Sequence, residues 1–350
     1  MVFSSILFIF RFLPIAMILY FLTPTKFKNL TLLLVSLIFY SWGEPKYFLI
    51  MVASIVVDYL VSRGIEKSRN NKKICLSISM IFNLGMLFFF KYFNFFIENL
   101  NNILGISLKY VNITLPLGIS FYTFQTMSYT IDVFLGKVKA EKNIINFGAF
   151  VCLFPQLIAG PIVKYTDINL ELKHRKIDII QIQDGIELFI IGLGSKVLIA
   201  NNIGAFWSEI EGRGFGGVGT IIAWMSVLAF ALQIYFDFSG YSLMAIGLGK
   251  ILGFNFPRNF NYPYISKSIT EFWRRWHITL GAWFKEYVYI PLGGNRVGRL
   301  RLYINLFIVW FLTGFWHGAS YNFILWGLYF FILISIEKAV LLKFLKNNKI

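Results

Sequence analysis

Histidines are the side chains of this sequence best suited to proton transfer, because an unperturbed imidazole titrates near neutral pH. His277 lies in a basic, aromatic segment, and His317 directly follows an apolar run that ends at Trp316. His174 lies in the charged stretch Lys173–Lys176, which is typical of a solvated surface. The other two histidines lack an i+3 or i+4 partner and the carboxylate or thiolate cluster of a zinc site. We therefore predict no metal and consider His317 and His277 for acid–base catalysis.

His317 is predicted to lie within the membrane, where burial of an imidazole costs free energy unless the ring is hydrogen-bonded or faces a polar cavity. The apolar run Leu302–Trp316 corresponds to about 22 Å of helix at about 1.5 Å per residue. With Arg299 and Arg301 at the cytoplasmic interface, His317 would lie inside the membrane, beyond its midplane. A hydrogen bond between helices explains such a histidine as well as catalysis does. For His277, which lies among arginines, the alternative to catalysis is a structural or head-group contact.

The composition is that of an integral membrane protein. Hydrophobic residues make up 57% of the 350 residues and charged residues 14%, whereas about a quarter of a soluble domain is charged. The net charge of +16 favours anionic membrane lipid and a phosphate-bearing substrate over nucleic acid as partners of so apolar a chain. The length allows about ten membrane spans, and we predict a single membrane domain over residues 1–350.

Apolar runs predict an all-α polytopic fold with about 10–11 transmembrane or re-entrant helices. Pro155, Gly160 and Pro161 could make one of these runs re-entrant. The expected spans are Val2–Leu22, Phe27–Trp42, Tyr47–Val61, Ile74–Phe90, Val111–Phe134, Ile144–Val163, Ile186–Ile203, Val218–Phe236, Phe238–Phe254, Leu302–Trp316 and Phe323–Leu342.

Basic loops predict the orientation, because cytoplasmic loops are rich in lysine and arginine. Two regions carry this excess: a loop with Arg63, Lys67, Arg69, Lys72 and Lys73, and a tail with Lys338, Lys343, Lys346 and Lys349. Three predicted spans precede the first region, which places the N-terminus outside. Eight predicted crossings separate the two regions, which agrees with both being cytoplasmic.

The segment from Pro257 to Arg301 is too charged to be an ordinary span. Four charged side chains within Phe272–Leu292 would cost on the order of 10 kcal/mol in lipid, against about 4 kcal/mol returned by the apolar residues. We therefore expect this segment to lie at the interface or to be enclosed by protein, and an enclosed charged segment is a candidate functional site. Glu271 and Arg275 have the spacing of an ion pair on one helix face.

Three further polar features have structural explanations. Gly212–Gly217 fits G-x-G-x-x-G, but no predicted strand precedes it, so we interpret it as a connection. The polar span Leu115–Asp132 faces either a cavity or other helices through hydrogen bonds. Asp237 lies between two apolar runs, where it could orient an imidazole or an arginine, or cap the next helix.

Several of these segments together resemble the membrane-bound O-acyltransferases, and specifically the branch of bacterial alginate O-acetyltransferases. The resemblance extends over essentially the whole chain, and the order of the motifs is more specific than any one of them. The motifs are Pro155–Pro161, Gln233–Tyr241, Asn259–Tyr264, Trp273–Leu280, Tyr289–Arg296 and Trp316–Ala319.

The resemblance implies a ring of helices around a channel, in a multi-pass protein of the bacterial cytoplasmic membrane. It makes His317 the catalytic histidine and His277 the second motif histidine. We expect His317 to act as general base in the transfer of an acyl group, most simply acetyl, to a hydroxyl of an exported polysaccharide. The donor would be acetyl-coenzyme A or another acyl thioester, with no permanently bound cofactor.

The other expected site residues support these two histidines. Arginines suit coenzyme A phosphates because guanidinium pairs with phosphate in a bidentate manner, although basic residues also gather at the cytoplasmic leaflet. Asp237, Trp273 and Trp316 would surround the histidines. The arginines expected at the donor entrance are Arg274, Arg275, Arg296, Arg299 and Arg301.

Two other functions remain open at this stage. One is D-alanyl transfer to teichoic acid within the same family, and the other is polysaccharide or lipid transport without covalent chemistry. The resemblance also implies an extracytoplasmic acetyltransferase partner of the secreted SGNH-hydrolase type. The chain ends 33 residues after His317, whereas relatives continue through further helices, so it is either a truncated or a short member.

Overall fold

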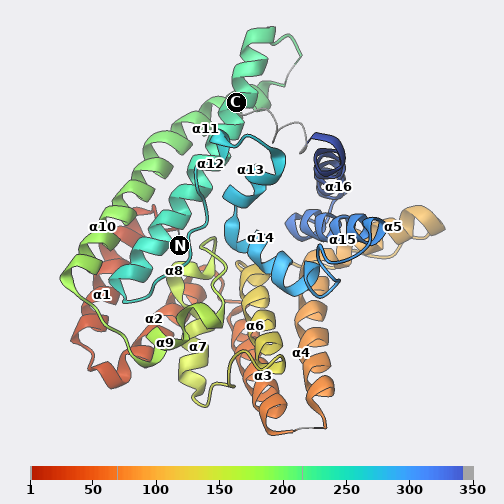
Figure 1. The fold of residues 1–350 in the computed structure, drawn as a ribbon. Coiled ribbons are helices and arrows are strands. Elements are labelled where there is room, and N and C mark those ends of the chain that lie inside the picture. Colours follow the sequence, from red (N-terminus) through yellow and green to blue (C-terminus); the bar gives the residue numbers. More distant parts are fainter. Residues whose placement is uncertain (1, 69, 215, 342–350) are drawn as a thin grey trace. The chain divides into compact units, whose positions relative to one another are not determined.

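The computed structural model describes residues 2–68, 70–214 and 216–341. These residues form helices and connections without a β-strand among them, as Figure 1 shows. Parts of four predicted features lie outside the described residues, so the structure does not test them there. They are Arg69 of the basic loop, Phe215 of the glycine motif, Leu342 of the last span, and Lys343, Lys346 and Lys349 of the tail.

Contacts divide the chain into two compact units, each built from two stretches. Unit 1 comprises Met1–Tyr59 and Glu141–Arg258, and unit 2 comprises Leu60–Ala140 and Asn259–Ile350. The helices of unit 1 are α1 (Leu13–Leu22), α2 (Lys28–Gly43), α7 (Ile144–Cys152), α8 (Phe154–Leu157), α9 (Tyr165–Lys173), α10 (Ile179–Gly194), α11 (Asn201–Arg213) and α12 (Thr220–Ile251). Unit 2 contains α4 (Lys72–Leu87), α5 (Phe93–Leu104), α6 (Ile119–Phe134), α13 (Ile269–Arg275), α14 (Ile278–Phe284), α15 (Arg299–His317) and α16 (Tyr321–Ile336), and α3 (Phe48–Lys67) spans the division.

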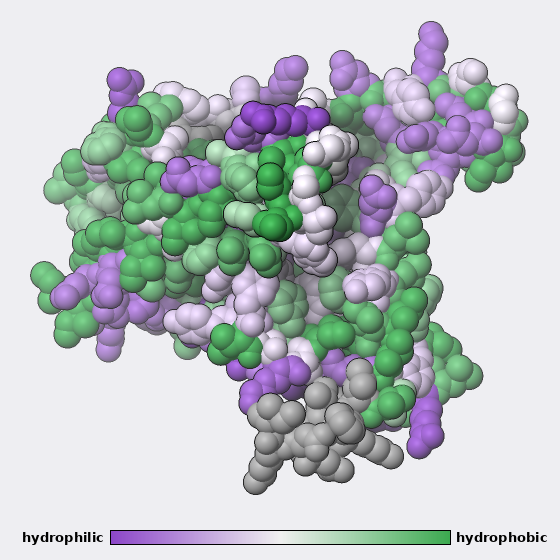
Figure 2. Space-filling model, turned by 90° about the horizontal axis from the view of Figure 1, so that it is seen from above, coloured by the Kyte–Doolittle hydropathy of each residue, from purple (hydrophilic) through white to green (hydrophobic). Residues whose placement is uncertain are grey.

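Five helical stretches of the described chain are long and apolar enough to cross a membrane. Large apolar side chains on them are exposed, for example Ile81 on α4 and Leu198 between α10 and α11, and Figure 2 shows broad apolar surface areas. The predicted all-helical, polytopic fold is confirmed, while the ring around a channel stays a prediction. The five stretches are Phe48–Lys67, Lys72–Leu104, Ile179–Arg213, Thr220–Ile251 and Tyr321–Val340.

The prediction of separate spans at 218–236 and 238–254 is wrong, because α12 continues from Thr220 to Ile251. A straight helix crosses a membrane once, so eight crossings between the two basic regions no longer follow. The basic loop is also shorter than predicted, since α3 extends to Lys67 and α4 begins at Lys72. In contrast, the glycine motif begins in the last residues of α11 and continues beyond Arg213 toward α12, as expected of a connection. His174 is exposed, also as expected.

Within unit 1, α10 and α12 pack closely side by side (Figure 1). A methyl group at Gly192 would lie 2.5 Å from the Gly240 carbonyl oxygen, so only glycine permits this approach. Small residues that bring backbones together are common where helices associate in membranes.

Within unit 2, hydrogen bonds tie α6 to its neighbours. Thr126 donates to Asn83 of α4 at 3.1 Å, so for these side chains the polar span packs against a helix, one of its two predicted explanations. On another side, the indole of Trp283 donates to the Phe124 carbonyl at 3.0 Å and stacks on the Phe124 ring. These contacts fix α14, and therefore the start of the candidate site, against α6.

Candidate active site

His277 and His317 line the same cavity of about 160 Å³ in unit 2. Forty residues separate them in sequence, yet the residue before α14 and the last residue of α15 line one space. Trp273, another predicted site residue, lines it too. The remaining walls are mostly apolar and comprise Trp276, Leu280, Gly281, Phe284, Val309, Trp310 and Thr313.

A break between α13 and α14 places His277 in the interior. The residue has φ +44°, a left-handed conformation that costs a non-glycine residue about 1–3 kcal/mol. The backbone of Asn259 accepts from the Ile278 amide at 2.8 Å, and the Asn261 amide donates to the Arg275 carbonyl at 2.9 Å. These bonds hold the turn. The charged segment is thus an interrupted helix whose central residues, including His277 and Leu280, are buried.

The side chain of Asn259 fixes the tautomer of His277. Its Oδ1 accepts from the Thr279 backbone amide at 3.3 Å and from the Thr279 hydroxyl at 2.9 Å. A backbone amide can only donate, so the atom that faces it is the carbonyl oxygen of the amide group. His277 Nδ1, 3.0 Å from the same oxygen, must therefore donate. The lone pair of the neutral ring then lies on Nε2.

Burial lowers the pKa of His277 below its ordinary value, and the nearby His317 adds to the shift. Desolvation disfavours the charged form of an imidazole, so the ring is neutral at pH 7. A neutral ring with its proton on Nδ1 accepts a hydrogen bond or a proton at Nε2 but cannot donate from that atom.

His317 is the last residue of α15, where backbone carbonyls lose their helical partners. Two side chains from the π-helical segment Phe88–Tyr92 supply donors there. The Tyr92 hydroxyl donates to the Phe315 carbonyl at 2.8 Å, and the Lys91 ammonium donates to the Trp316 carbonyl. A cation near a helix C-terminus is also favoured by the helix dipole. These two bonds fix the backbone that carries His317.

The ring of His317 is exposed, unlike that of His277. It lies edge to face with Trp326 of α16, with centroids 5.0 Å apart. A close approach of α15 and α16 makes this contact, since a methyl group at Gly314 would lie 2.3 Å from the Phe323 carbonyl oxygen. The ring of the buried Trp316 lies 6.2 Å from that of His277.

Residues 138–347 match the membrane-bound O-acyltransferase (MBOAT) family. This chain belongs to that family. It is 42% identical over 347 residues to the probable alginate O-acetylase AlgI of Pseudomonas aeruginosa, with 97% of this chain and 66% of that relative covered. It is 38% identical to the peptidoglycan O-acetyltransferase of Helicobacter pylori (97% and 71% covered) and 28% identical to the teichoic acid D-alanyltransferase of Bacillus subtilis (63% and 58% covered).

The chain spans about two thirds of the length of the AlgI relatives. The predicted resemblance to the MBOAT family, and to its alginate branch, is confirmed, because the AlgI proteins match nearly the whole chain at 39–42% identity. The D-alanyltransferases are more distant and match a smaller part.

The structure separates the predicted arginines of this MBOAT chain into two kinds. Arg275 is held by Glu271, with 2.7 Å between Nη2 and Oε1, and it also donates to the Asn261 carbonyl. The predicted ion pair on one helix face is thus confirmed, and it occupies the guanidinium. The other four are exposed, and their guanidinium groups make no hydrogen bond or ion pair within the described residues: Arg274, Arg296, Arg299 and Arg301.

Asp237 lies inside α12 and forms an ion pair with Lys196 of the π-helical segment Ser195–Ala200. The suggested role as a cap of a following helix is wrong, because no helix begins there. Its partner is a lysine rather than an imidazole or an arginine. Both residues belong to unit 1.

Lys91 and Asn259 are the contributors that the sequence interpretation missed. A lone lysine in the aromatic run Leu87–Phe93 was a usable signal, because a charge within a membrane segment requires a partner. Asn259 begins one of the motifs of the resemblance, but only the folded turn brings it to His277 from 18 residues away, so the motif gave no sign of this contact.

Proposed function

We propose that this chain transfers an acyl group, most simply acetyl, from a thioester to a hydroxyl group of an exported polysaccharide in the bacterial cytoplasmic membrane. The single observation that carries the proposal is the cavity that His277 and His317 share. Support also comes from relatives named as an alginate O-acetylase and a peptidoglycan O-acetyltransferase.

His317 is the general base of the proposed reaction, because its ring is exposed and its backbone is fixed. The acceptor hydroxyl gives its proton to the imidazole while its oxygen bonds to the thioester carbonyl carbon. The carbon–sulfur bond then breaks, and the leaving thiolate takes the proton from the imidazolium. Such positioned acid–base catalysis contributes about 10²–10⁴-fold.

His277 serves as a proton acceptor next to this base. Polarisation of the carbonyl and proton relay are its two candidate roles. Its tautomer favours the relay, because Nε2 carries a lone pair and has no proton to donate to a developing oxyanion. The hydrogen bond to Asn259 stabilises the ring when Nε2 receives a proton.

Acetyl-coenzyme A is the proposed donor, and the four exposed arginines are its proposed phosphate contacts. Guanidinium groups that no carboxylate occupies are available to a phosphate, so Arg275 contributes least. An extracytoplasmic SGNH-type acetyltransferase is the proposed partner in delivery to the polysaccharide.

The decisive experiment replaces His317 with Ala in cells whose own copy has been deleted, with His174→Ala as the matched control. Exported polysaccharide, its ester-linked acetyl and ester-linked D-alanine are measured at equal membrane levels of each variant. We expect acetyl to fall at least about 100-fold for His317→Ala and to stay unchanged for His174→Ala. Undiminished acetylation would overturn the proposal, and normal acetylation with blocked export would indicate a transporter. Loss of D-alanine alone would indicate the D-alanyl function.

A further inference from the structure

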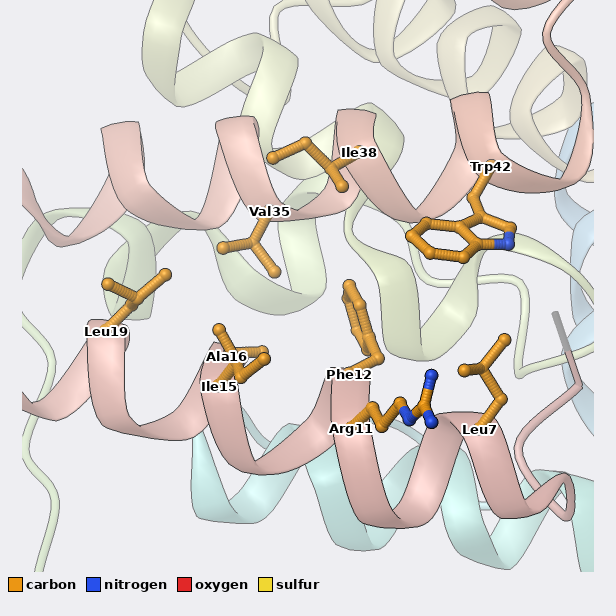
Figure 3. A pocket seen from close by; sticks show the side chains of 9 residues that line it. All are labelled: Leu7, Arg11, Phe12, Ile15, Ala16, Leu19, Val35, Ile38 and Trp42. Carbon is orange, nitrogen blue, oxygen red and sulfur yellow. The ribbon is translucent and has the colours of Figure 1, made fainter.

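An apolar groove between α1 and α2 of unit 1 is lined by one charged residue, Arg11. The groove has a volume of about 280 Å³. Figure 3 shows α2 along one side and α1 with the preceding π-helical segment Phe8–Phe12 along the other. Its lining comprises Leu7, Arg11, Phe12, Ile15, Ala16, Leu19, Val35, Ile38 and Trp42.

Arg11 has no acidic partner and no hydrogen bond within residues 2–68, 70–214 and 216–341, and it is exposed. The side chain of Arg11 lines the groove, and its guanidinium lies at the edge beside Leu7 and Phe12, toward the end that Trp42 faces (Figure 3). A charged side chain in an otherwise apolar membrane helix is costly unless it has a partner. An anion of matching geometry would offset that cost, and guanidinium binds phosphate through two parallel hydrogen bonds.

The dimensions of the groove match one leaflet of a bilayer. From Leu7 to Leu19 the helix rises about 18 Å at about 1.5 Å per residue, and half of the hydrocarbon core is about 15 Å. Tryptophan concentrates at the membrane interface, so Trp42 marks the head-group end, where Arg11 also lies. Beyond Arg11 the lining is wholly apolar as far as Leu19.

We propose that this groove binds one anionic phospholipid, with its phosphate on Arg11 and an acyl chain along α1 and α2 toward Leu19. Charge complementarity selects the lipid: a second apolar helix would cover the groove but leave the guanidinium unpaired. The cation and the apolar groove together match a ligand with an anionic phosphate and a long hydrocarbon chain.

The test is native mass spectrometry of the full chain released from nanodiscs that contain equal phosphatidylglycerol and phosphatidylcholine. We expect one phosphatidylglycerol to survive detergent exchange in the wild-type protein. Arg11→Gln should lower its occupancy about tenfold, whereas Arg213→Gln, which changes another exposed arginine of unit 1, should not. Arg11→Lys should retain part of the selectivity, because it keeps the charge without the bidentate geometry.

Two further measurements extend the test. One asks whether a soluble phosphate binds in place of the lipid, and the other asks whether the apolar lining contributes to binding. Soluble glycerol phosphate at millimolar concentration should not displace the lipid, because the acyl chain supplies most of the contact. Ile38→Trp changes an exposed residue of the groove lining. The larger side chain should fill the groove and reduce the retention of phosphatidylglycerol even with Arg11 intact. Equal retention by Arg11→Gln and Arg213→Gln, or displacement by glycerol phosphate alone, would overturn the proposal.

Discussion

His277 and His317 share a cavity but are held in opposite ways. A left-handed turn and the side chain of Asn259 fix the buried ring of His277. His317 is exposed, and what is fixed is the helix end below it, through Lys91 and Tyr92. Contacts made to the ring itself, as at His277, suit a side chain that must keep one tautomer. Positioning through the backbone suits a group that must reach a substrate.

The largest expected effect tests whether the two rings act as one unit. His317→Ala should lower acetyl transfer at least about 100-fold, and adding His277→Ala should lower it by less than about a further twofold, because one proton route is already lost. Acetyl transfer to polysaccharide in isolated membranes measures both variants. If the activity losses of the two single variants multiplied in the double variant, the two histidines would not share one proton route.

Removal of the partner of His277 should have the next largest effect. Asn259→Leu deletes the acceptor for Nδ1–H, and we expect about a 10- to 100-fold loss of activity, as for other groups that orient a functional imidazole. Asn259→Asp keeps an acceptor and should retain most activity, with the pH optimum moved upward because a carboxylate raises the pKa of a neighbouring imidazole. Equal losses in the two variants would argue that the position serves packing alone.

A smaller effect is expected where the backbone is held. Lys91→Met leaves the Trp316 carbonyl without its donor, and we expect about a tenfold loss of transfer activity, since a hydrogen bond to a charged group contributes about 1.5–3 kcal/mol. Lys109→Met, which changes an exposed lysine of the same unit, is the control. Full activity of Lys91→Met would show that the C-terminal end of α15 keeps its position without this hydrogen bond.

The smallest effect concerns stability against pH. The pKa of His277 is lowered by burial to about 3, and in the unfolded chain it is about 6.5. The unfolded state therefore binds a proton first, and stability falls as the pH drops below about 6.5. From pH 7.5 to 6.0 we expect this group to remove about 0.8 kcal/mol. Thermal unfolding in detergent should show this decrease in stability for the control variant His174→Ala but not for His277→Asn.

Much of this arrangement could be predicted from residue type and spacing. The apolar runs indicated helices, the charges of the segment from Pro257 to Arg301 indicated that it is not a plain span, and Glu271 and Arg275 indicated their own ion pair. These features depend on neighbours within a few residues. The partner of His277 comes from 18 residues away, and Lys91 reaches the Trp316 carbonyl beside His317 from 225 residues away. Only tertiary structure brings these residues together.

The error at α12 has the same origin. A carboxylate between two apolar runs resembles a break when read alone, so two spans were predicted. Lys196, 41 positions earlier, neutralises Asp237, and the helix continues through it. Here the acidic residue does not mark a helix end, because a basic residue from another helical segment reaches it.

The Lys196–Asp237 pair also constrains how the chain is assembled in its membrane. Each charge alone would cost about 2.5–3.5 kcal/mol on leaving the translocon for lipid. Once α10 and α12 are joined, with glycines allowing close contact and the charges facing each other, much of that cost disappears. We therefore expect the two helices to enter the lipid bilayer together, after α12 has been synthesised.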